Sequence, residues 1–533
     1  MIRYPSILLI FAFLSNLAYA QTSSLTLLCL AAHPDDEDGA ALVYYSKIKG
    51  YKAYTIFYTR GEGGQNEIGP ELNEELGKIR EEECYKAALI QASTAYFLGF
   101  LDFGYSKTAK ETFKFWGGKN SVLTRIVFMI RALRPDVVIS NHDTITTEPN
   151  RQHGNHQAVG ITMYEAFEKA ADSNFHPEQL VDGITPWQIK KLYFRVYDSA
   201  KTSRIFTLDI NQKDASGKTI LETAIEALNQ HKTQGMDKLD RKNIPGISKK
   251  RRYELVRSDK MYPPDGDDLF EGLVQSPKLS GKDELTSYPT FYSYKNIDPE
   301  DSIRILKSIR YEKDYKIGLV KTYDNSIQTV FNAFGVKYDT LTEQSMDAGD
   351  LSLYQTIILD IRTYLIRRDA EKLNARLLEY ANNGGNIICF YNKPQDWNGK
   401  FISPYPIYIT SERVSEEDAS VTVLEPNHDF FTKPNPINEN DWNGWVQERN
   451  IYLPSDDPVK TSHKYIKLLA MHDEDDPVPS TSLLYTMYGK GTYTYCSLAL
   501  FRQLKIFNEG ALKLLMNMIS QPDYFSRILK EHF

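Results

Sequence analysis

The residue types best suited to chemistry in this chain follow an apolar segment near its start. Residues 25–31 (LTLLCLA) predict a buried strand, and residues 32–37 read AHPDDE. His33, Asp35 and Asp36 can bind a metal ion or transfer protons, and open α/β sheets bind ligands at the carboxyl ends of their strands. Pro followed by acidic residues is also the ordinary opening of a helix, so this motif alone leaves two interpretations open.

A second cluster favours the chemical interpretation. His153 and His156 follow another apolar run, residues 137–140, about 120 residues further along the chain. A catalytic zinc site needs three protein ligands and one open position for water, and His33, Asp36 and His156 would supply two imidazoles and one carboxylate. The same donor set also suits iron(II).

The remaining groups of the two clusters have roles to fill in metal-assisted hydrolysis. The side chains of Asp35 and Asp36 diverge because the residues are adjacent, so Asp35 is free to act as the general base on a water molecule that the metal acidifies. His153 lies three residues before a ligand and can reach the developing oxyanion or the leaving nitrogen.

Alternating strands and helices must position these clusters. Strands are predicted at 25–31, 52–58, 95–100, 136–140 and 191–197, with helices at 39–49, 71–92, 121–133 and 156–171. Right-handed βαβ units and a mostly parallel sheet follow from this spacing. Residues 203–275 hold one further strand and a helix near 221–232, and then a polar, basic segment interpreted as an exposed arm.

A second α/β unit begins near residue 313, after a connector over 276–312. Strands are predicted at 315–321, 356–361 and 386–391, helices near 325–335 and 369–382, and a β-rich insertion within 392–480. A strand pair around 482–497 and an amphipathic helix near 509–519 complete the unit.

The order of the motifs resembles the PIG-L/LmbE-like de-N-acetylase family, known for N-acetylglucosaminyl-phosphatidylinositol de-N-acetylase. The resemblance covers about residues 25–275 and depends on AHPDDE at 32–37, TRGEGGQN at 59–66, Arg80 with Glu83, LDFG at 101–104, RPDVV at 134–138 and the His-x-x-His of His153. Residues 313–533 resemble a class I glutamine-amidotransferase-like, flavodoxin-like domain. Cys389 lies inside a predicted strand without a glycine elbow, so this second domain is expected to be non-catalytic.

The family resemblance implies a Rossmann-like fold and zinc-dependent removal of N-acetyl groups from an amino sugar. It assigns His33, Asp36 and His156 as metal ligands, Asp35 as base, and His153 as the group that stabilises or protonates the intermediate. It further implies that Arg80 and Asp102 contact the sugar and that Glu62 is a loop acid near the site.

One departure from the family concerns the residue between the two histidines. Many members have Asp there, whereas this chain has Asn155, which would tune the charge of a neighbouring histidine less. Two other functions stay open at this point: hydrolysis of a different small amide conjugate, and carbohydrate binding without turnover.

Composition and the chain start limit the remaining possibilities. The 533 residues suffice for two or three domains, and a net charge of -7 without a basic stripe argues against nucleic acid as a partner. Arg3, the apolar residues 7–14 and Ala18-Tyr19-Ala20 predict a signal peptide at 1–20, cleaved near Ala20, and a secreted or periplasmic protein. No later stretch reaches the ~20 apolar residues of a transmembrane helix. The 4 cysteines lack Cys-x-x-Cys spacing, which predicts small buried side chains rather than a thiolate site. Oligomeric state is not predicted.

Overall fold

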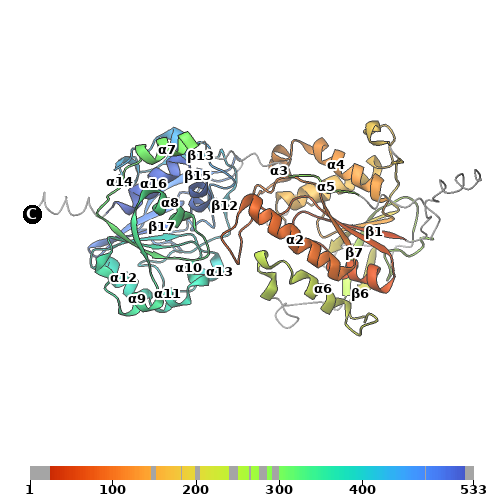
Figure 1. Ribbon diagram of the computed structural model, residues 1–533, viewed down its shortest axis with the longest axis horizontal. Coiled ribbons are helices and arrows are strands. Elements are labelled where there is room, and N and C mark those ends of the chain that lie inside the picture. The colour runs from red at the N-terminus through yellow and green to blue at the C-terminus, as the bar shows by residue number, and fades with distance from the viewer. Residues whose placement is uncertain are drawn as a thin grey trace, which may run out of the picture. The chain divides into compact units, whose positions relative to one another are not determined.

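The computed structural model describes residues 25–145, 152–181, 183–197, 204–238, 250–262, 266–274, 285–290, 299–474 and 476–521. The predicted signal peptide at 1–20 lies outside these residues. The chain divides into two units (Figure 1). Of the described residues, the first unit holds those from 25 to 62, Asn73–Asp102 and those from 108 to 290; the second holds Gly63–Leu72, Phe103–Lys107 and those from 299 onward. Within the described part, no helix combines the length and apolar character needed to cross a membrane.

The first unit is built on a seven-stranded sheet in the order β3-β2-β1-β4-β5-β7-β6. Its parallel strands are β1 (Thr26–Ala31), β2 (Lys52–Phe57), β3 (Thr94–Phe97), β4 (Val137–Ser140) and β5 (Lys191–Val196). Two antiparallel strands complete it, β7 (Lys250–Ser258) and β6 (Ile205–Asp209). Every residue of β1 is buried, as expected for a strand covered by helices on both faces.

Helices cover both faces of this sheet (Figure 1). One face carries α1 (Gly39–Val43), continued by the π-helix η1 (Tyr44–Ile48), with α2 (Asn73–Gln91) and α6 (Ile220–Leu228). The other carries α3 (Ala109–Phe115), α4 (Lys119–Leu133) and α5 (Gly154–Lys169). Short 3-10 turns lie at η2 (Pro177–Gln179), η3 (Lys232–Gln234) and η4 (Met236–Lys238).

Local capping signals define where the helices of the first unit begin. Asp38 accepts a hydrogen bond from the Ala41 amide at 3.2 Å and so caps α1 directly after the AHPDDE motif. Thr219 and Glu222 form a reciprocal capping box at the start of α6. The first of these caps makes the site loop rigid at its carboxyl end, because the loop passes straight into a helix.

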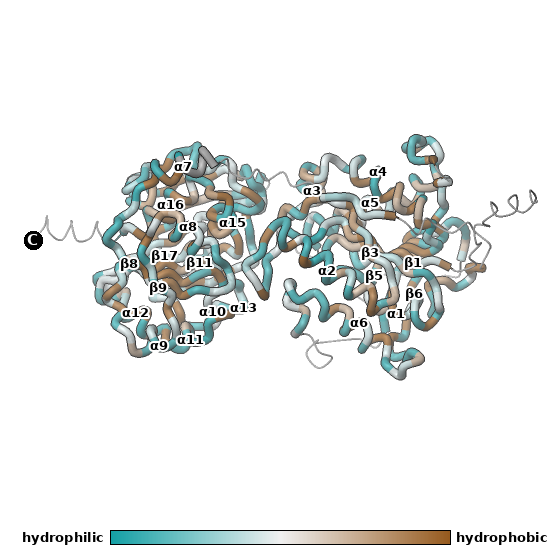
Figure 2. The backbone as a smooth tube through the Cα atoms, in the orientation of Figure 1, coloured by the Kyte–Doolittle hydropathy of each residue, from teal (hydrophilic) through white to brown (hydrophobic). Residues whose placement is uncertain are grey.

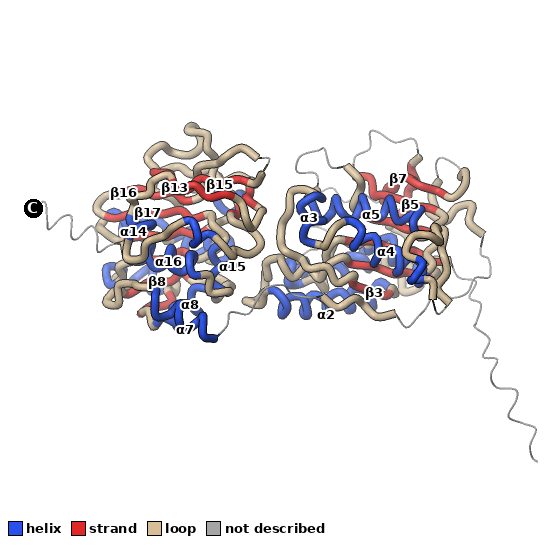
Figure 3. The backbone as a smooth tube through the Cα atoms, turned by 90° about the horizontal axis from the view of Figure 1, so that it is seen from above, coloured by secondary structure: helices blue, strands red, loops and turns tan. Residues whose placement is uncertain are grey.

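The second unit has an eight-stranded sheet in the order β13-β15-β16-β17-β11-β10-β8-β9. Strands β8, β13, β15, β16 and β17 of this sheet are labelled in Figure 3. Its parallel strands are β8 (Lys316–Val320), β9 (Lys337–Thr340), β10 (Thr356–Leu359), β11 (Asn386–Phe390) and β17 (Gly491–Cys496). The antiparallel strands are β13 (Ser420–Val423), β15 (Ile466–His472) and β16 (Leu483–Tyr488). A separate pair joins β12 (Arg413–Val414) to β14 (Asn450–Ile451).

Two apolar clusters cover the two faces of the second sheet, and its central strands are among the most apolar parts of the chain (Figure 2). The helices on one face are α7 (Pro299–Ser308), α8 (Ser326–Phe334), α14 (Asp429–Thr432), α15 (Leu500–Lys505) and α16 (Glu509–Ile519). The helices on the other are α9 (Glu343–Ala348), α10 (Thr363–Ile366), α11 (Arg368–Lys372), α12 (Asn374–Asn382) and α13 (Pro394–Trp397). The 3-10 turns η5 (Leu351–Leu353) and η6 (Glu439–Trp442) complete the unit.

The predicted fold class, a mostly parallel Rossmann-like sheet followed by a second α/β unit, is confirmed, and several elements differ from the prediction. The basic segment interpreted as an arm is in part wrong: Lys250–Ser258 is strand β7, in which Tyr253 and Leu255 are buried. Residues 239–249 lie outside the described part of the chain. Helix α3, strand β9 and helix α7, which falls within the expected connector, were not predicted.

Candidate metal centre

The AHPDDE motif forms a tight turn at the carboxyl end of β1. The amide of Asp36 donates to the His33 carbonyl at 3.2 Å, which closes the turn, and Asp35 has a positive φ of 78°. Asp is among the few residues other than glycine that tolerate this left-handed conformation. The two carboxylates have different neighbours: Asp36 lies beside His33 and His156, whereas the charges of His231 and Arg80 act on Asp35.

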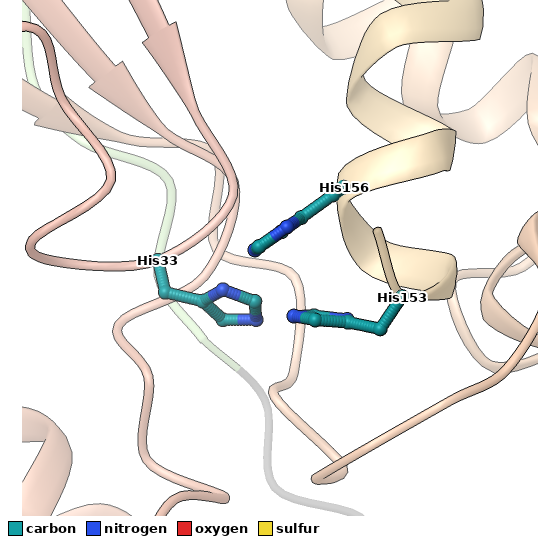
Figure 4. A group of neighbouring side chains, drawn as sticks. All are labelled: His33, His153 and His156. Atoms are coloured by element: carbon teal, nitrogen blue, oxygen red, sulfur yellow. The ribbon is translucent and has the colours of Figure 1, made fainter. Parts of the chain in front are cut away.

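The second motif opens helix α5. His153 is the N-cap residue of that helix, and His156 lies in its first turn. The preceding strand β4 pairs with β1 in parallel, Leu28 opposite Val138, so the two strand ends meet at the same edge of the sheet. Figure 4 shows the three imidazole rings converging, with His33 contributed by the turn and the other two by the helix.

Two of the predicted ligands, His33 and His156, lie beside one carboxylate oxygen of the third, Asp36. Asp36 Oδ2 lies 3.0 Å from His33 Nδ1 and 3.2 Å from His156 Nε2. Both separations are those of hydrogen bonds. Among the described residues, His33, His153 and His156 form a group whose ligand atoms all lie within 4.8 Å of one another, whereas the predicted set of His33, Asp36 and His156 is not itself such a group.

Electrostatics within the site favour a charged carboxylate beside the imidazoles. Burial alone would raise the pKa of Asp36, but the charge of His156 and then of His142 holds that pKa well below its ordinary value. Burial lowers the pKa of His33, and this effect is outweighed by the hydrogen bond to Asp36 and the charge of Asp102, which together raise the pKa to about 9. A charged carboxylate oxygen facing imidazole nitrogens is a donor set that can bind a divalent cation, which then takes the place of the protons on these groups.

His142 is a site residue that the sequence reasoning did not single out. Its Nε2 lies 3.6 Å from Asp36 Oδ2, and its ring stacks on that of His156 with centroids 4.1 Å apart. Asp36, His142 and His156 thus form a second group of potential ligands. However, the Ala32 amide donates to His142 Nε2 at 3.2 Å, so this lone pair is engaged and His142 supports the ring of His156 from behind. The signal was present, because His142 follows β4 by two residues.

Asp35 has the environment of a general base. It is partly exposed, and burial together with the charge of Asp36 raises its pKa from 3.8 to about 7. A base is most effective when its pKa lies near the working pH. His153, whose ring centroid lies 3.8 Å from that of His156, has its pKa lowered well below the ordinary value by burial, and it is therefore neutral near pH 7.

The three residues expected to contact substrate are buried close to one another and to Asp35. Arg80, Asp102 and Glu62 have 4%, 4% and 1% of their surface exposed, and both carboxylates act on the Arg80 guanidinium. Burial and the charge of Asp102 raise the pKa of Glu62 to about 7. Arg80 donates from Nε to Thr233 Oγ1 at 3.2 Å and from Nη1 to the Gly61 carbonyl, so its position is held by the protein itself.

A turn at residues 231–234 holds the AHPDDE loop in place through side-chain contacts. Gln234 Nε2 donates to the Pro34 carbonyl at 2.7 Å, and His231 Nε2 lies 3.2 Å from Glu37 Oε1. Thr233 donates to Glu83 through both its amide and its hydroxyl, at 3.0 and 2.7 Å. This segment therefore holds both the AHPDDE turn and helix α2.

Comparison with known proteins agrees with this geometry. The family model described as PIG-L, GlcNAc-PI de-N-acetylase, matches residues 28–167. These residues form a PIG-L family domain. The match spans β1 through α5 and so contains both histidine motifs. The proposed likeness of the second unit to glutamine amidotransferases stays a prediction.

Several solved structures resemble parts of the chain at TM-scores of 0.30 or below. N,N'-diacetylchitobiose deacetylase from Pyrococcus horikoshii is 21% identical over 39% of this chain and 70% of its own, with a TM-score of 0.30. The 4-carboxy-2-hydroxymuconate hydratase GalB from Pseudomonas putida is 15% identical over 45% and 99%, with a TM-score of 0.30. A β-galactosidase from Rahnella sp. R3 is 17% identical over 40% and 32%, with a TM-score of 0.26.

The departure of this PIG-L domain from the common family pattern has a structural consequence. Asn155 is fully buried; its Nδ2 lies 3.1 Å from His33 Nε2, and Thr112 Oγ1 donates to its Oδ1 at 2.9 Å. The expectation that this position acts on a histidine next to it in sequence is therefore incomplete. The side chain contacts His33, 122 residues away, at the nitrogen that faces away from Asp36.

Proposed function

We propose that the first unit is a zinc-dependent N-deacetylase that hydrolyses the acetamide of an N-acetyl-hexosamine glycan or glycoconjugate. The observation that carries this proposal is the meeting of His33 Nδ1 and His156 Nε2 on Asp36 Oδ2, at 3.0 and 3.2 Å, next to a carboxylate with a raised pKa. The PIG-L match over residues 28–167 supports the reaction class.

The residues present fit a divalent cation and divide the chemistry among them. His33, Asp36 and His156 would hold the ion, which supplies Lewis acidity toward water and the amide carbonyl when bound. Asp35 takes the proton of the attacking water, since its pKa near 7 lets it both accept and return a proton at neutral pH. His153 donates toward the oxygen or nitrogen of the cleaved amide.

Substrate recognition is assigned to the buried charged group beside the site. Arg80, Asp102 and Glu62 offer a fixed guanidinium and two carboxylates. Carboxylates accept hydrogen bonds from sugar hydroxyls, and a guanidinium donates to hydroxyl or carbonyl oxygens. We also propose export after cleavage near Ala20, on the basis of the N-terminal segment described above.

The proposal is tested by measuring acetate release from a panel of N-acetylated glycans, before and after chelation and with zinc or iron(II) restored. His156→Ala is expected to lose bound metal and activity together, whereas Asp35→Asn is expected to retain metal and lose activity. His176→Ala and Asp214→Asn, which alter an exposed ion pair and an exposed turn, are the matched controls.

Two outcomes contradict the proposal. Acetate release that is unaffected by thorough chelation would remove the role of the metal. Full activity in Asp35→Asn would remove the general base and with it the mechanism.

A further inference from the structure

The carboxyl edge of the second sheet is lined by charged side chains. Arg362 follows β10, Asp324 follows β8, and Arg502 and Lys505 lie on α15, which follows β17. All but Lys505 are buried, and Arg362 has a positive φ of 53°. This edge is where open α/β sheets bind their ligands, so buried cations there require a partner of opposite charge or a set of acceptors.

Within the second unit, these cations contact the segment Gly63–Leu72 in addition to the acidic side chains of Asp396, Glu448 and Asp324. Glu67 forms an ion pair with Arg362, in which both side chains are largely buried. Arg502 donates to the Gly63 carbonyl at 2.7 Å, and Lys505 donates to the Pro70 carbonyl at 2.7 Å. Both ends and the middle of the segment are thus held.

The segment is itself ordered and seated on the apolar core. Leu72 packs against the cluster that contains the α15 and α16 side chains. Asn66 is 1% exposed, and its Oδ1 accepts from the amides of Ile68 and Gly69, each at 3.1 Å. This turn, with one acidic side chain facing a buried arginine, occupies the sheet edge as a bound acidic ligand would, although it belongs to the same chain.

A second segment of the same unit is held in a similar way. In Phe103–Lys107, Lys107 forms ion pairs with Asp473, at 2.7 Å, and with Asp476. The Arg413 guanidinium lies 4.6 Å from the centre of the Tyr105 ring. Asp473 in turn accepts from the Ser415 amide and hydroxyl, both at 2.9 Å, which keeps it in place.

Each held segment continues directly from a residue of the buried charged group. Gly63 is joined to Glu62 by one peptide bond, and Phe103 is joined to Asp102 in the same way. We propose that the second unit is a non-catalytic holder whose ligand edge binds Gly63–Leu72 in place of a small molecule, and that it thereby positions Glu62 and Asp102 for substrate. This inference rests on the proposed function for its kinetic consequence, but not for the holding itself.

Positioning of this kind acts on substrate binding rather than on the chemical step. Glu67 and Arg362 are not part of the imidazole site, so their loss leaves metal ligands and base in place. A displaced Glu62 weakens contacts made to the substrate before and during reaction alike, which raises KM and spares kcat. A segment that only stabilised the fold would leave both KM and kcat unchanged once the protein is folded.

The test uses the full-length protein with Glu67→Gln, Arg362→Gln and the double variant. Lys316→Gln, which breaks an exposed 2.6 Å pair with Asp339 in the same unit, is the control. Hydrogen–deuterium exchange of peptides covering 63–72 is expected to be about tenfold faster in each single variant and no faster still in the double, because one charge-assisted hydrogen bond is lost in all three. The control is expected to match the parent.

Kinetics of acetate release provide the second measurement. KM is expected to rise about tenfold in Glu67→Gln with kcat within about twofold of the parent and zinc content unchanged. Parental exchange rates in both single variants overturn the inference, as does a fall in kcat with KM unchanged. If the parent releases no acetate from any glycan, the proposed function fails, and the exchange rates alone decide whether this edge holds the segment.

Discussion

Asn155→Asp is the substitution that most directly probes how the metal centre is oriented. Asn155 lies between Thr112 Oγ1 at 2.9 Å and His33 Nε2 at 3.1 Å. Turning the amide by 180° presents its oxygen to His33, so that the ring donates from Nε2 and keeps the Nδ1 lone pair on the side of Asp36. Metal-binding imidazoles are usually oriented in this way by an acceptor on the second nitrogen. A carboxylate at position 155 is a stronger acceptor in the same place.

The expected gain follows from the strength of such outer contacts. Removing an orienting partner typically weakens metal binding by about 10- to 100-fold, which corresponds to ~1.4–2.8 kcal/mol. Exchanging a neutral acceptor for a charged one is expected to strengthen zinc binding by about tenfold, at the lower end of this range. The cost appears without metal: position 155 is fully buried, and a carboxylate there would have to share the charge of His33 with Asp36.

Two measurements separate the gain from the cost. Competition of the purified protein with a chelator of known zinc affinity gives the metal dissociation constant, and thermal unfolding with and without chelator gives the stability of each state. We expect Asn155→Asp to bind zinc more tightly than the parent but to unfold at a lower temperature once chelated. Asn155→Ala, which has no acceptor, is expected to bind zinc about 10-fold more weakly. A folded Asn155→Asp protein with weaker zinc binding than the parent would refute the assignment of Nδ1 as the coordinating atom.

Two further substitutions test other parts of the structure. His142→Phe keeps a ring beside His156 but leaves the Ala32 amide without its acceptor. Denaturant unfolding is therefore expected to show a free energy of unfolding lower by about 1–3 kcal/mol, with zinc stoichiometry retained. Loss of the metal in this variant would instead make His142 a ligand. Burial and the charge of Asp324 raise the pKa of Asp360 from 3.8 to about 7, so the stabilising neutral form is present at low pH and is lost as pH rises through 7. Because Asn does not titrate, Asp360→Asn is expected to gain stability relative to the parent by up to ~1.4 kcal/mol per pH unit between about pH 4 and 7, and a pH-independent difference would contradict the shift.

The sequence predicts most of the parallel core because buried strands and amphipathic helices carry strong local patterns. All five parallel strands of the first unit lie within a few residues of their expected bounds, and so do helices α2, α4 and α5. Strand β7 escaped prediction because its charged residues dominate the composition. Lys250, Arg251 and Arg252 obscure the alternation in which Tyr253 and Leu255 face the core.

The two histidine motifs could be found in the sequence because chemistry concentrates at strand ends. His33, Asp36 and His156 are predicted from residue type and position; the structure places both imidazoles beside one Asp36 oxygen, and their role as metal ligands stays a prediction. The turn at 231–234 could not be predicted, since its contacts depend on a chain return of 150 to 200 residues with no local signal beyond the residue types. His142 had the right position but is a single histidine, and such residues are more often structural.

In the second unit, the carboxyl ends of the strands do not bring together a set of catalytic groups. Cys389 is buried inside β11 with its pKa raised to about 12 by burial, so the place where a nucleophile would be needed holds an inert thiol. Arg362, at the neighbouring strand end, is paired with Glu67 of the same chain, 295 residues away. A site that bound an exchangeable ligand would keep its cation accessible, whereas this one is closed by a covalently attached partner. The contacts at this edge hold that segment rather than an exchangeable molecule, which is the physical reason to assign the second unit a positioning role rather than a second reaction.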